Sequence, residues 1–427
     1  MNINSLYELF LKCGKVSTDT RKIEPGSIFF ALKGPSFNAN AFAEEALTKG
    51  ASYAIIDDLF YQKNEQIILV DDALITLQEL AKYHRGKLRI PVIGLTGSNG
   101  KTTSKELMQA VLSKKFKTLA TKGNLNNHIG VPLTILSIDT SVELAIIEMG
   151  ANHVGEIAFL SSIANPTHGF ITNIGKAHIG TFGGFENIIR GKSELYQHLI
   201  TNSGVVFINS QNPILANMAK RFKNPIFYPA KSDFYHCELE GADPFVIVTV
   251  EDGTKITTQL VGAYNFENIA TALCIGKFFE VPANKANDAI AEYVPSNMRS
   301  QIIKKNNNTI ILDAYNANPS SMQAAIENLA SINAAKKVAI VGDMFELEEE
   351  AEVEHRAIGK LLREKNFDKV YLCGKLMRSA KEEFIDAMYF ETKELLLEEL
   401  KKNKLTDAII LIKASRGIGL ETILEFL

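Results

Sequence analysis

A glycine-rich stretch at residues 94–103, G-L-T-G-S-N-G-K-T-T, carries the residue types of a phosphate-binding loop. The usual pattern is G-x-x-x-x-G-K-[ST], and Gly100, Lys101 and Thr102 match its end. The first glycine of the pattern is missing, because Leu95 stands at that position. In such loops the lysine reaches the β- and γ-phosphates of a nucleotide and the hydroxyl ligates Mg²⁺. The alternative is an ordinary glycine-rich turn.

The residues on either side of this loop favour the phosphate site over the ordinary turn. Residues 92–96, V-I-G-L-T, are typical of a buried strand, and residues 102–116 have apolar side chains at helical spacing. A strand that leads through such a turn into a helix points backbone N–H groups and the positive end of the helix dipole at one place. We therefore predict nucleotide binding at residues 94–103.

Polar side chains stand where the next predicted strands end. Glu148 ends the strand at residues 144–150, and His178 follows the strand at residues 169–175. Ligands of an open parallel sheet lie at the carboxyl ends of its strands, so Glu148 is expected to face Thr102 as a second metal contact. For His178 two interpretations stay open, a functional residue or a surface histidine, since Mg²⁺ prefers oxygen ligands.

Three further candidates each have a simpler interpretation. Lys192, in R-G-K-S-E-L-Y at an expected helix start, can be a solvated lysine. Asn265 and Asn268, in G-A-Y-N-F-E-N, can be helix caps or can read an adenine edge. Asp313, at the start of D-A-Y-N-A-N-P, can hold a ribose hydroxyl or belong to a turn that caps the next helix.

The order of strands and helices predicts an α/β protein of three domains. A small N-terminal α/β module is followed by a central doubly wound domain that carries the loop, and then by a second, Rossmann-like α/β domain. Residues 82–89, K-Y-H-R-G-K-L-R, are expected to form a basic linker, and residues 245–260 a hairpin inserted in the central domain. The expected domain boundaries are 1–86, 87–296 and 297–427.

Composition excludes several classes of protein. The 46 basic and 49 acidic residues nearly cancel, so the totals carry no nucleic-acid footprint. The four cysteines show no CxxC spacing, which argues against a zinc ribbon or a disulfide framework. The first residues lack the pattern of a signal peptide, and no apolar run approaches the ~20 residues of a membrane span. We expect a cytoplasmic protein.

Taken together, these motifs resemble those of the Mur ligases, the ATP-dependent enzymes that build the peptide of peptidoglycan. T-G-S-N-G-K-T-T is similar to the family loop T-G-[TS]-x-G-K-T, which often lacks the first glycine. S-T-D-T-R-K-I-E-P-G-S-I-F-F-A-L-K-G (residues 17–34) resembles the family's UDP-recognising start, and T-K-G-N-L-N-N-H-I-G-V-P (residues 121–132) resembles its substrate loop. I-I-E-M-G, T-N-I-G-K-A-H-I-G and G-D-M-F-E-L also match, so the resemblance covers nearly the whole chain.

Within the family, D-A-Y-N-A-N-P-S-S-M (residues 313–322) resembles the branch that joins D-alanyl-D-alanine to UDP-N-acetylmuramoyl-tripeptide. This resemblance implies that the terminal carboxylate attacks ATP, forms an acyl phosphate and is then attacked by the amine. The branch that adds the third amino acid usually carries D-N-P-R, which is absent here. A folylpolyglutamate synthase would lack the UDP-type start. The alternative from another class is a nucleotide-switch protein that only binds partners. The N-K-x-D motif, which recognises guanine in such proteins, is absent.

The resemblance also implies a role for each candidate residue. Lys101, His178 and Lys192 would be catalytic, with Lys192 carbamylated and so turned into a carboxylate-like group. Two Mg²⁺ ions would be held with the help of Thr102, Glu148 and His178. ATP would contact Thr96, Gly97, Ser98, Asn99, Gly100, Lys101, Thr102, Thr103, Asn268, Arg299 and Asp313. The two substrates would contact Thr20, Arg21 and Lys33 near UDP, and Asn124, Asn126, Asn127, Asn316, Lys413, Ser415 and Arg416. We expect a monomer without a nucleic-acid partner or a membrane span.

Three motifs depart from the family pattern. N-A-N at residues 38–40 stands where D-G-H is usual, which puts the UDP contacts of that loop in question. Glu348 replaces the last glycine of G-D-M-x-E-L-G, and Ala414 replaces the glycine of K-G-S-R. The change to Ala414 is expected to shift the local backbone.

Overall fold

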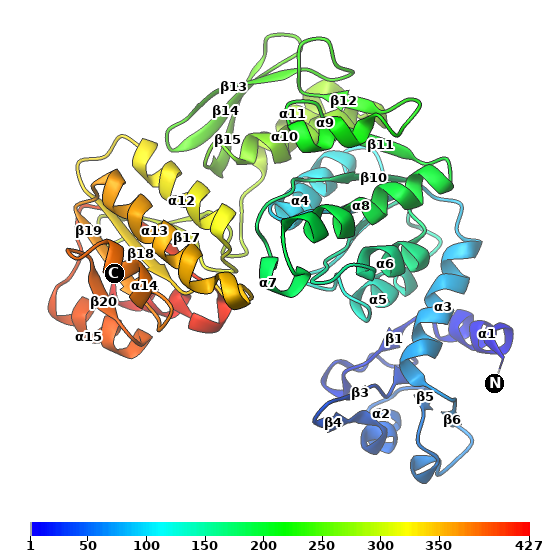
Figure 1. Cartoon of the computed structure of the whole chain (residues 1–427). Helices are drawn as coiled ribbons and strands as arrows, with labels where there is room; N and C mark the ends of the chain where they lie inside the picture. Colours follow the sequence, from blue (N-terminus) through cyan, green and yellow to red (C-terminus); the bar gives the residue numbers. More distant parts are fainter. Residues whose placement is uncertain (1) are drawn as a thin grey trace.

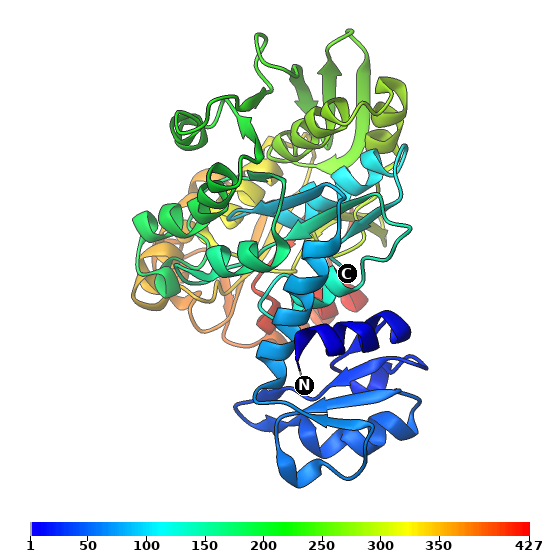
Figure 2. The ribbon, with the colours of Figure 1, turned by 90° about the vertical axis from the view of Figure 1, so that its right-hand side faces the viewer.

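Apolar runs in three parts of the chain form three parallel or mainly parallel sheets, which helices cover (Figure 1). The computed structural model describes residues 2–427. The N-terminal part lies below the central part in Figures 1 and 2, and the C-terminal part lies beside the central part. The predicted α/β class is confirmed. Among the described residues, no helix is long and apolar enough to cross a membrane.

The N-terminal part contains a four-stranded parallel sheet in the order β1-β2-β5-β6. The apolar stretch at residues 27–34 forms two short strands, β2 and β3, because the chain turns after β2 and forms the β3–β4 hairpin. The elements, with 3₁₀ helices labelled η, are α1 (Ile3–Cys13), β1 (Val16–Ser17), η1 (Thr20–Lys22), β2 (Ile28–Phe30), β3 (Lys33–Gly34), β4 (Phe37–Asn38), η2 (Ala39–Phe42), α2 (Ala43–Thr48), β5 (Tyr53–Ile56), η3 (Leu59–Tyr61), β6 (Ile67–Leu69) and α3 (Ala73–Lys87).

The prediction of a basic linker at residues 82–89 is wrong, because residues 82–87 form the last turns of α3. Arg85 is buried there and acts as an anchor. Its Nε donates to the carbonyl of Ala164 and its Nη2 to the carbonyl of Asn165, both at 2.8 Å. These carbonyls lie at the C-terminal end of α6, so one buried cation ties the N-terminal part to the central sheet and interacts favourably with the helix dipole.

The central part is built on a six-stranded parallel sheet in the order β12-β11-β10-β7-β9-β8. All five residues of β7 are buried, as expected of a parallel strand covered on both faces. The chain adds β8 and β9 on one side of β7 and β10, β11 and β12 on the other. This arrangement puts a topological switch point at the end of β7, where ligands of doubly wound sheets bind.

The helices and strands of the central part are β7 (Val92–Thr96), α4 (Lys101–Leu112), β8 (Thr118–Ala120), α5 (Gly130–Leu136), β9 (Leu144–Glu148), α6 (Glu156–Ala164), β10 (His168–Ile171), α7 (Ile179–Phe182), α8 (Phe185–Thr201), β11 (Val205–Asn209), α9 (Pro213–Ala219), β12 (Ile226–Tyr228), β13 (Cys237–Ala242), β14 (Phe245–Val250), β15 (Lys255–Val261), α10 (Asn265–Phe278) and α11 (Ala283–Glu292). The predicted hairpin is β14–β15, and β13 extends it to a three-stranded antiparallel sheet.

The C-terminal part has a six-stranded sheet in the order β16-β17-β21-β18-β19-β20, in which only the β16–β17 pair is antiparallel among the described strands. Its elements are β16 (Gln301–Lys305), β17 (Asn308–Asp313), α12 (Pro319–Ser331), β18 (Lys337–Gly342), η4 (Glu348–Glu350), α13 (Ala351–Lys365), β19 (Lys369–Cys373), α14 (Arg378–Glu383), β20 (Met388–Phe390), α15 (Lys393–Lys402), β21 (Ile409–Lys413), η5 (Arg416–Ile418) and η6 (Leu420–Phe426).

The anchor at Arg85 leads to a stability prediction. Arg85→Ala leaves two buried carbonyls without their partner, so we expect the free energy of unfolding to fall by about 2–4 kcal/mol in urea denaturation. The exposed neighbour Arg89 provides the control, and Arg89→Ala should change the same quantity by less than about 0.5 kcal/mol. Equal urea midpoints for the two variants would contradict the anchoring role.

Candidate active site

A cleft of about 850 Å³ lies at the end of β7, between the central and the C-terminal parts. The phosphate loop and the ends of β9 and β10 form one wall, and the segment before β16 and the loop after β17 contribute the other. The predicted site residues that line it are Ser98, Asn99, Gly100, Lys101, Thr103, Asn124, Asn126, Asn127, Glu148, His178, Asn268, Arg299, Asp313, Asn316 and Lys413. Residues from both large sheets therefore meet in one cavity.

The phosphate loop is held in shape by the end of β10. The Asn99 amide donates to Asn173 Oδ1 at 3.0 Å, and Thr172 Oγ1 donates to the Asn99 carbonyl at 2.6 Å. Gly97 has φ +149° and a Cβ there would lie 1.9 Å from Thr172 Oγ1. Gly100 has φ +78° and its Cβ would lie 2.5 Å from Asn268 Oδ1. Both positions therefore require glycine, whereas the missing first glycine of the pattern is not needed.

Lys101 begins α4, and none of the described side chains caps this helix. Its Nζ donates to the carbonyls of Gly97 at 2.7 Å and of Ser98 at 3.2 Å. The pKa of Lys101 is lowered to about 8, mainly by burial; the Glu148 carboxylate opposes this effect, and the Arg299 guanidinium adds to it. An ammonium with few partners, beside the uncapped start of a helix, is suited to receive phosphate oxygens.

Thr102 and Glu148 face each other, as predicted. The Thr102 hydroxyl donates to Glu148 Oε2 at 3.1 Å, and Asn126 Nδ2 donates to Glu148 Oε1 at 2.9 Å. Glu148 is buried at the end of β9, and its partners fix the direction of the carboxylate. A hydroxyl and a carboxylate side by side are the oxygen donors that Mg²⁺ prefers.

The donor set thus fits one Mg²⁺ that keeps waters or phosphate oxygens as its other ligands. Among residues 2–427, no group of three or more His, Cys, Asp or Glu side chains is placed to hold a metal by itself. Mg²⁺ is usually bound through one or two carboxylates together with the phosphates of the substrate.

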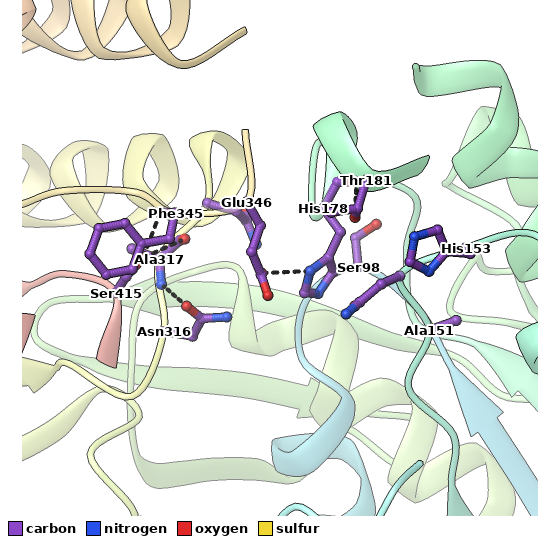
Figure 3. A network of polar contacts seen from close by, with 12 residues as sticks. Ser98, Ala151, His153, His178, Thr181, Asn316, Ala317, Phe345, Glu346 and Ser415 are labelled. Carbon is purple, nitrogen blue, oxygen red and sulfur yellow. Dashed lines mark hydrogen bonds and ion pairs between the residues drawn. The ribbon is translucent and has the colours of Figure 1, made fainter. Parts of the chain in front are cut away.

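His178 points across the cleft to the C-terminal part (Figure 3). Its Nδ1 lies 2.6 Å from Glu346 Oε2, and the imidazole holds the pKa of the Glu346 carboxyl below its usual value. His178 adopts φ +57° at the start of α7. No described hydrogen bond joins His178 to Thr102 or Glu148. The histidine is therefore an interdomain contact in this structure, and the prediction that it holds a metal remains untested.

Lys192 was expected at a helix start, but it lies in the middle of α8. The interpretation as a solvated lysine is also wrong, since the side chain is only 1% exposed. Its Nζ donates to the carbonyl of Ala151 at 3.2 Å and lies 5.2 Å from the centre of the Phe182 ring. Burial first, and then the charge of Lys101, hold the pKa of Lys192 well below its usual value.

Asn265 and Asn268 lie inside the first turn of α10, so the interpretation as helix caps is wrong. Asn268 Oδ1 accepts from Ser104 Oγ at 2.8 Å, and its Nδ2 donates to Asn265 Oδ1 at 2.9 Å. Asn268 also packs against Gly100. The amide braces the phosphate loop from the side of α10, while it lines the cleft.

The wall from the C-terminal part is built around Tyr315. The Arg299 guanidinium lies 3.9 Å from the centre of this ring and that of Arg416 lies 5.3 Å from it. Arg299 Nε is buried and has no hydrogen-bond partner among the described residues. Asp313 accepts a hydrogen bond from Lys413 Nζ at 2.7 Å, so the two are an ion pair at the ends of β17 and β21.

The remaining predicted substrate residues fall in two places. Asn316 accepts from its neighbour Ala317, and Ser415 Oγ accepts from the Phe345 amide, so both shape the loops of the C-terminal wall (Figure 3). Thr20, Arg21 and Lys33 lie in the N-terminal part and do not line the cleft. Arg21 pairs there with Asp19, and Lys33 lies 2.8 Å from Asp57.

The structure explains the three departures from the family pattern. Asn40 is buried and exchanges hydrogen bonds with Asp57, which also pairs with Lys33. Glu348 has φ +47°, so the position keeps the left-handed backbone that its usual glycine adopts freely. Ala414 is buried beside Gly342 without a positive φ, so the expected backbone shift is not needed.

Several residues of the cleft were not predicted. Asn318 Nδ2 donates to Asn99 Oδ1 at 2.7 Å while its own Oδ1 caps α12, and Lys176 pairs with Glu354 across the two domains. Asn318 lies in D-A-Y-N-A-N-P and Glu346 in G-D-M-F-E-L, two motifs that the sequence singles out. No spacing in the sequence indicates that these side chains reach the opposite domain.

The fold and the site define a nucleotide-binding enzyme with a phosphate loop at the switch point of a parallel sheet and a second α/β domain across the cleft. Comparison with known proteins makes this more specific. The family model described as the Mur ligase middle domain matches residues 95–276, and the model described as Mur ligase, glutamate ligase domain matches residues 298–416. The chain therefore belongs to the Mur ligase family.

Individual relatives indicate which branch of the Mur ligase family this chain is most similar to. The UDP-N-acetylmuramoyl-tripeptide–D-alanyl-D-alanine ligase of Bacillus subtilis is 35% identical, over 99% of this chain and 94% of the relative. A crystal structure of MurF from Acinetobacter baumannii has a TM-score of 0.86 at 30% identity and covers 96% of this chain and 92% of its own. MurF of Thermotoga maritima in complex with ADP has a TM-score of 0.84 at 27% identity and covers 97% of each chain. The predicted three-domain architecture is thereby confirmed.

The low pKa of Lys101 predicts how nucleotide binding depends on pH. Lys101 is cationic below its pKa of about 8 and loses its charge above it, so we expect the affinity for ADP to fall as the pH rises through that value. Isothermal titration calorimetry between pH ~6.5 and ~9.5 measures this, and the loss is at most about tenfold per pH unit. Lys101→Arg keeps its charge throughout and should flatten the profile. An ADP affinity that does not change with pH in the unaltered protein would refute the assignment of Lys101 to the phosphate site.

Proposed function

We propose that this protein is an ATP-dependent ligase that joins D-alanyl-D-alanine to UDP-N-acetylmuramoyl-tripeptide through an acyl phosphate. The observation that carries the proposal is the cleft itself. Lys101, Thr102 and Glu148 gather at its central wall, and the Asp313–Lys413 pair with Tyr315 forms the opposite wall. Relatives with this name cover almost the whole chain.

The central wall supports phosphoryl transfer. Lys101 and the uncapped amides of α4 would stabilise the charge that develops on the transferred phosphoryl group. Thr102 and Glu148 would hold a Mg²⁺ ion, which would neutralise part of the phosphate charge. Asn126 keeps the Glu148 carboxylate directed at Thr102. The substrate carboxylate attacks the γ-phosphate and ADP leaves, so no nucleophilic side chain is required.

The C-terminal wall supports the second step. D-alanyl-D-alanine must bring its amine to the acyl phosphate, with phosphate as the leaving group. Asn316, Lys413, Ser415 and Arg416 are the residues we assign to this substrate, while Arg299 and Asp313 contact the nucleotide from the same side. The interdomain pairs His178–Glu346 and Asn99–Asn318 link the two walls of the cleft, and further closure around the substrates would exclude water from the acyl phosphate.

The N-terminal part would bind the UDP end of the tripeptide substrate. Its candidate residues Thr20, Arg21 and Lys33 lie outside the cleft, which suits a long substrate whose UDP end is remote from the reacting carboxylate. We propose functional domains at residues 1–86, 87–296 and 297–427. The first boundary falls at the last turn of α3, and the second falls between α11 and β16. A cytoplasmic monomer suits this reaction, because ATP and the UDP-linked substrate are cytoplasmic.

Lys192 is the residue that we propose to be carbamylated. A carbamate forms on a neutral amine, and burial favours the neutral form of Lys192. The product would carry a negative charge at a buried place where a cation is unfavourable, near Lys101. His178 would help to hold a second Mg²⁺.

The proposed reaction is tested by phosphate release. Release should require both UDP-N-acetylmuramoyl-tripeptide and D-alanyl-D-alanine, and substrates with meso-diaminopimelate or lysine at the third position are assayed side by side. Lys101→Ala should lower kcat by at least about 100-fold, because it removes a charge placed for the transferred phosphoryl group. Phosphate release with neither substrate would indicate a plain nucleotidase, and coupling with a free amino acid in place of the dipeptide would indicate the tripeptide-forming branch.

The modification of Lys192 is tested with ¹³C-bicarbonate. We expect a carbamate carbon signal by NMR in the unaltered protein and its absence in Lys192→Gln, with kcat about 100-fold lower in that variant. Lys220, which is exposed, serves as the control, and Lys220→Gln should keep both the signal and the activity. A signal that persists in Lys192→Gln would place the carbamate elsewhere.

A further inference from the structure

The connection between α11 and β16 carries Arg299 from the central to the C-terminal part. Met298 has φ +56° and Ser300 has φ +53°, so two residues other than glycine hold the left-handed conformation on either side of Arg299. Such backbone costs on the order of 1–3 kcal/mol at each position and persists only where surrounding contacts hold it. The structure therefore has to supply contacts that fix residues 293–300, which we call the linker.

Glu106 supplies the contacts at the start of the linker. Its Oε2 accepts from the Tyr293 hydroxyl at 2.5 Å, and both carboxylate oxygens accept from Asn297 Nδ2, at 2.9 and 3.1 Å. The side chain of Glu106 is 27% exposed, so these charge-assisted hydrogen bonds are partly shielded from water. One carboxylate thus holds two residues of the linker.

Glu106 belongs to α4, the helix whose first turn contains Lys101 and Thr102. The next link is Lys105, which is only 3% exposed and places its Nζ 4.0 Å from Glu106 Oε1 and 4.0 Å from Glu148 Oε2. A single buried ammonium therefore lies between the carboxylate that holds the linker and the carboxylate that faces Thr102. The phosphate site and the linker are connected through one helix and one charge.

The other end of the linker meets the cleft. The hydroxyl groups of Tyr264 and Ser300 share a hydrogen bond at 2.7 Å, and the Ser300 amide donates to Asp313 Oδ1 at 3.3 Å. Arg299 lies over Tyr315 with its Nε buried and unpaired among the described residues. The conformation of the linker thus decides whether this guanidinium and the C-terminal wall face the phosphate loop.

We propose that Glu106 is a positioning residue that fixes the linker to α4, so that the C-terminal domain closes over the site when the phosphate loop is occupied. The inference rests on the proposed function for its role in turnover. Its effect on closure can be measured without any ligation. Glu106 is not among the residues that line the cleft, and it acts through Tyr293 and Asn297.

The experiment compares Glu106→Ala, Glu106→Gln and Tyr293→Phe with a matched control. Glu292 precedes Tyr293 at the end of α11 and pairs at 3.1 Å with Lys114, which follows α4, but its side chain is 70% exposed. Glu292→Gln therefore removes a neighbouring ion pair of the kind that contributes little. Each variant is measured for kcat, for ADP affinity by calorimetry, and for the change in radius of gyration by X-ray scattering when a nonhydrolysable ATP analogue and Mg²⁺ are added.

We expect Glu106→Ala to lower kcat about tenfold and to reduce the analogue-induced compaction, with ADP affinity changed less than about threefold, because the loop itself is intact. Glu106→Gln keeps one acceptor oxygen and should fall between Ala and the unaltered protein. Tyr293→Phe removes a single hydroxyl, preserves packing, and should add little to Glu106→Ala in the double variant. Glu292→Gln should match the unaltered protein in every measurement.

Unchanged compaction in both Glu106→Ala and Tyr293→Phe would overturn the proposal, as would a parallel loss of ADP affinity and kcat. Reduced compaction would support it even if the protein showed no ligation, in which case the proposed function alone would fail. Should Glu106→Ala fold poorly, Tyr293→Phe decides the question, since it changes only the hydrogen bond to Glu106.

Discussion

The close contact between the phosphate loop and the end of β10 is the constraint on which the rest of the site depends. Thr172 and Asn173 bind the backbone of Asn99 from both its amide and its carbonyl side. This approach leaves no room for a side chain at Gly97. With the loop held in this way, α4 starts with unpaired amides directed at the cleft, and Lys101 and Thr102 take their places beside Glu148.

Burial of like charges sets the electrostatics of the cleft. Burial is the main reason why the pKa values of Lys101 and Lys192 fall; the Arg299 charge adds to the effect at Lys101, and the Lys101 charge adds to it at Lys192. Glu148 is the opposite charge in the same region, and Lys105 is a further buried cation 4.0 Å from it. Phosphate groups and a metal would complete this arrangement, since each unpaired buried charge is costly by itself.

Much of the fold was predictable from short-range pattern. The runs V-I-G-L-T and L-A-I-I-E are fully buried strands, because a parallel sheet covered by helices favours continuous apolar residues. The basic stretch at residues 82–89 was predicted wrongly as a linker. Its polarity conceals that His84 and Arg85 are buried in α3, where backbone carbonyls brought from distant segments satisfy them. The interpretation of Lys192 as a solvated lysine was wrong for the same reason, since a polar residue on a helix is usually solvated.

The sequence by itself determined the phosphate loop, the residue types at the strand ends and the family, because these depend on local spacing and on glycine conformation. Only the tertiary structure decided which side chains meet across the cleft. The His178–Glu346, Asn99–Asn318 and Glu106–Asn297 contacts each join residues more than a hundred positions apart. Their geometry depends on how two separate sheets are oriented, and no local periodicity records that orientation.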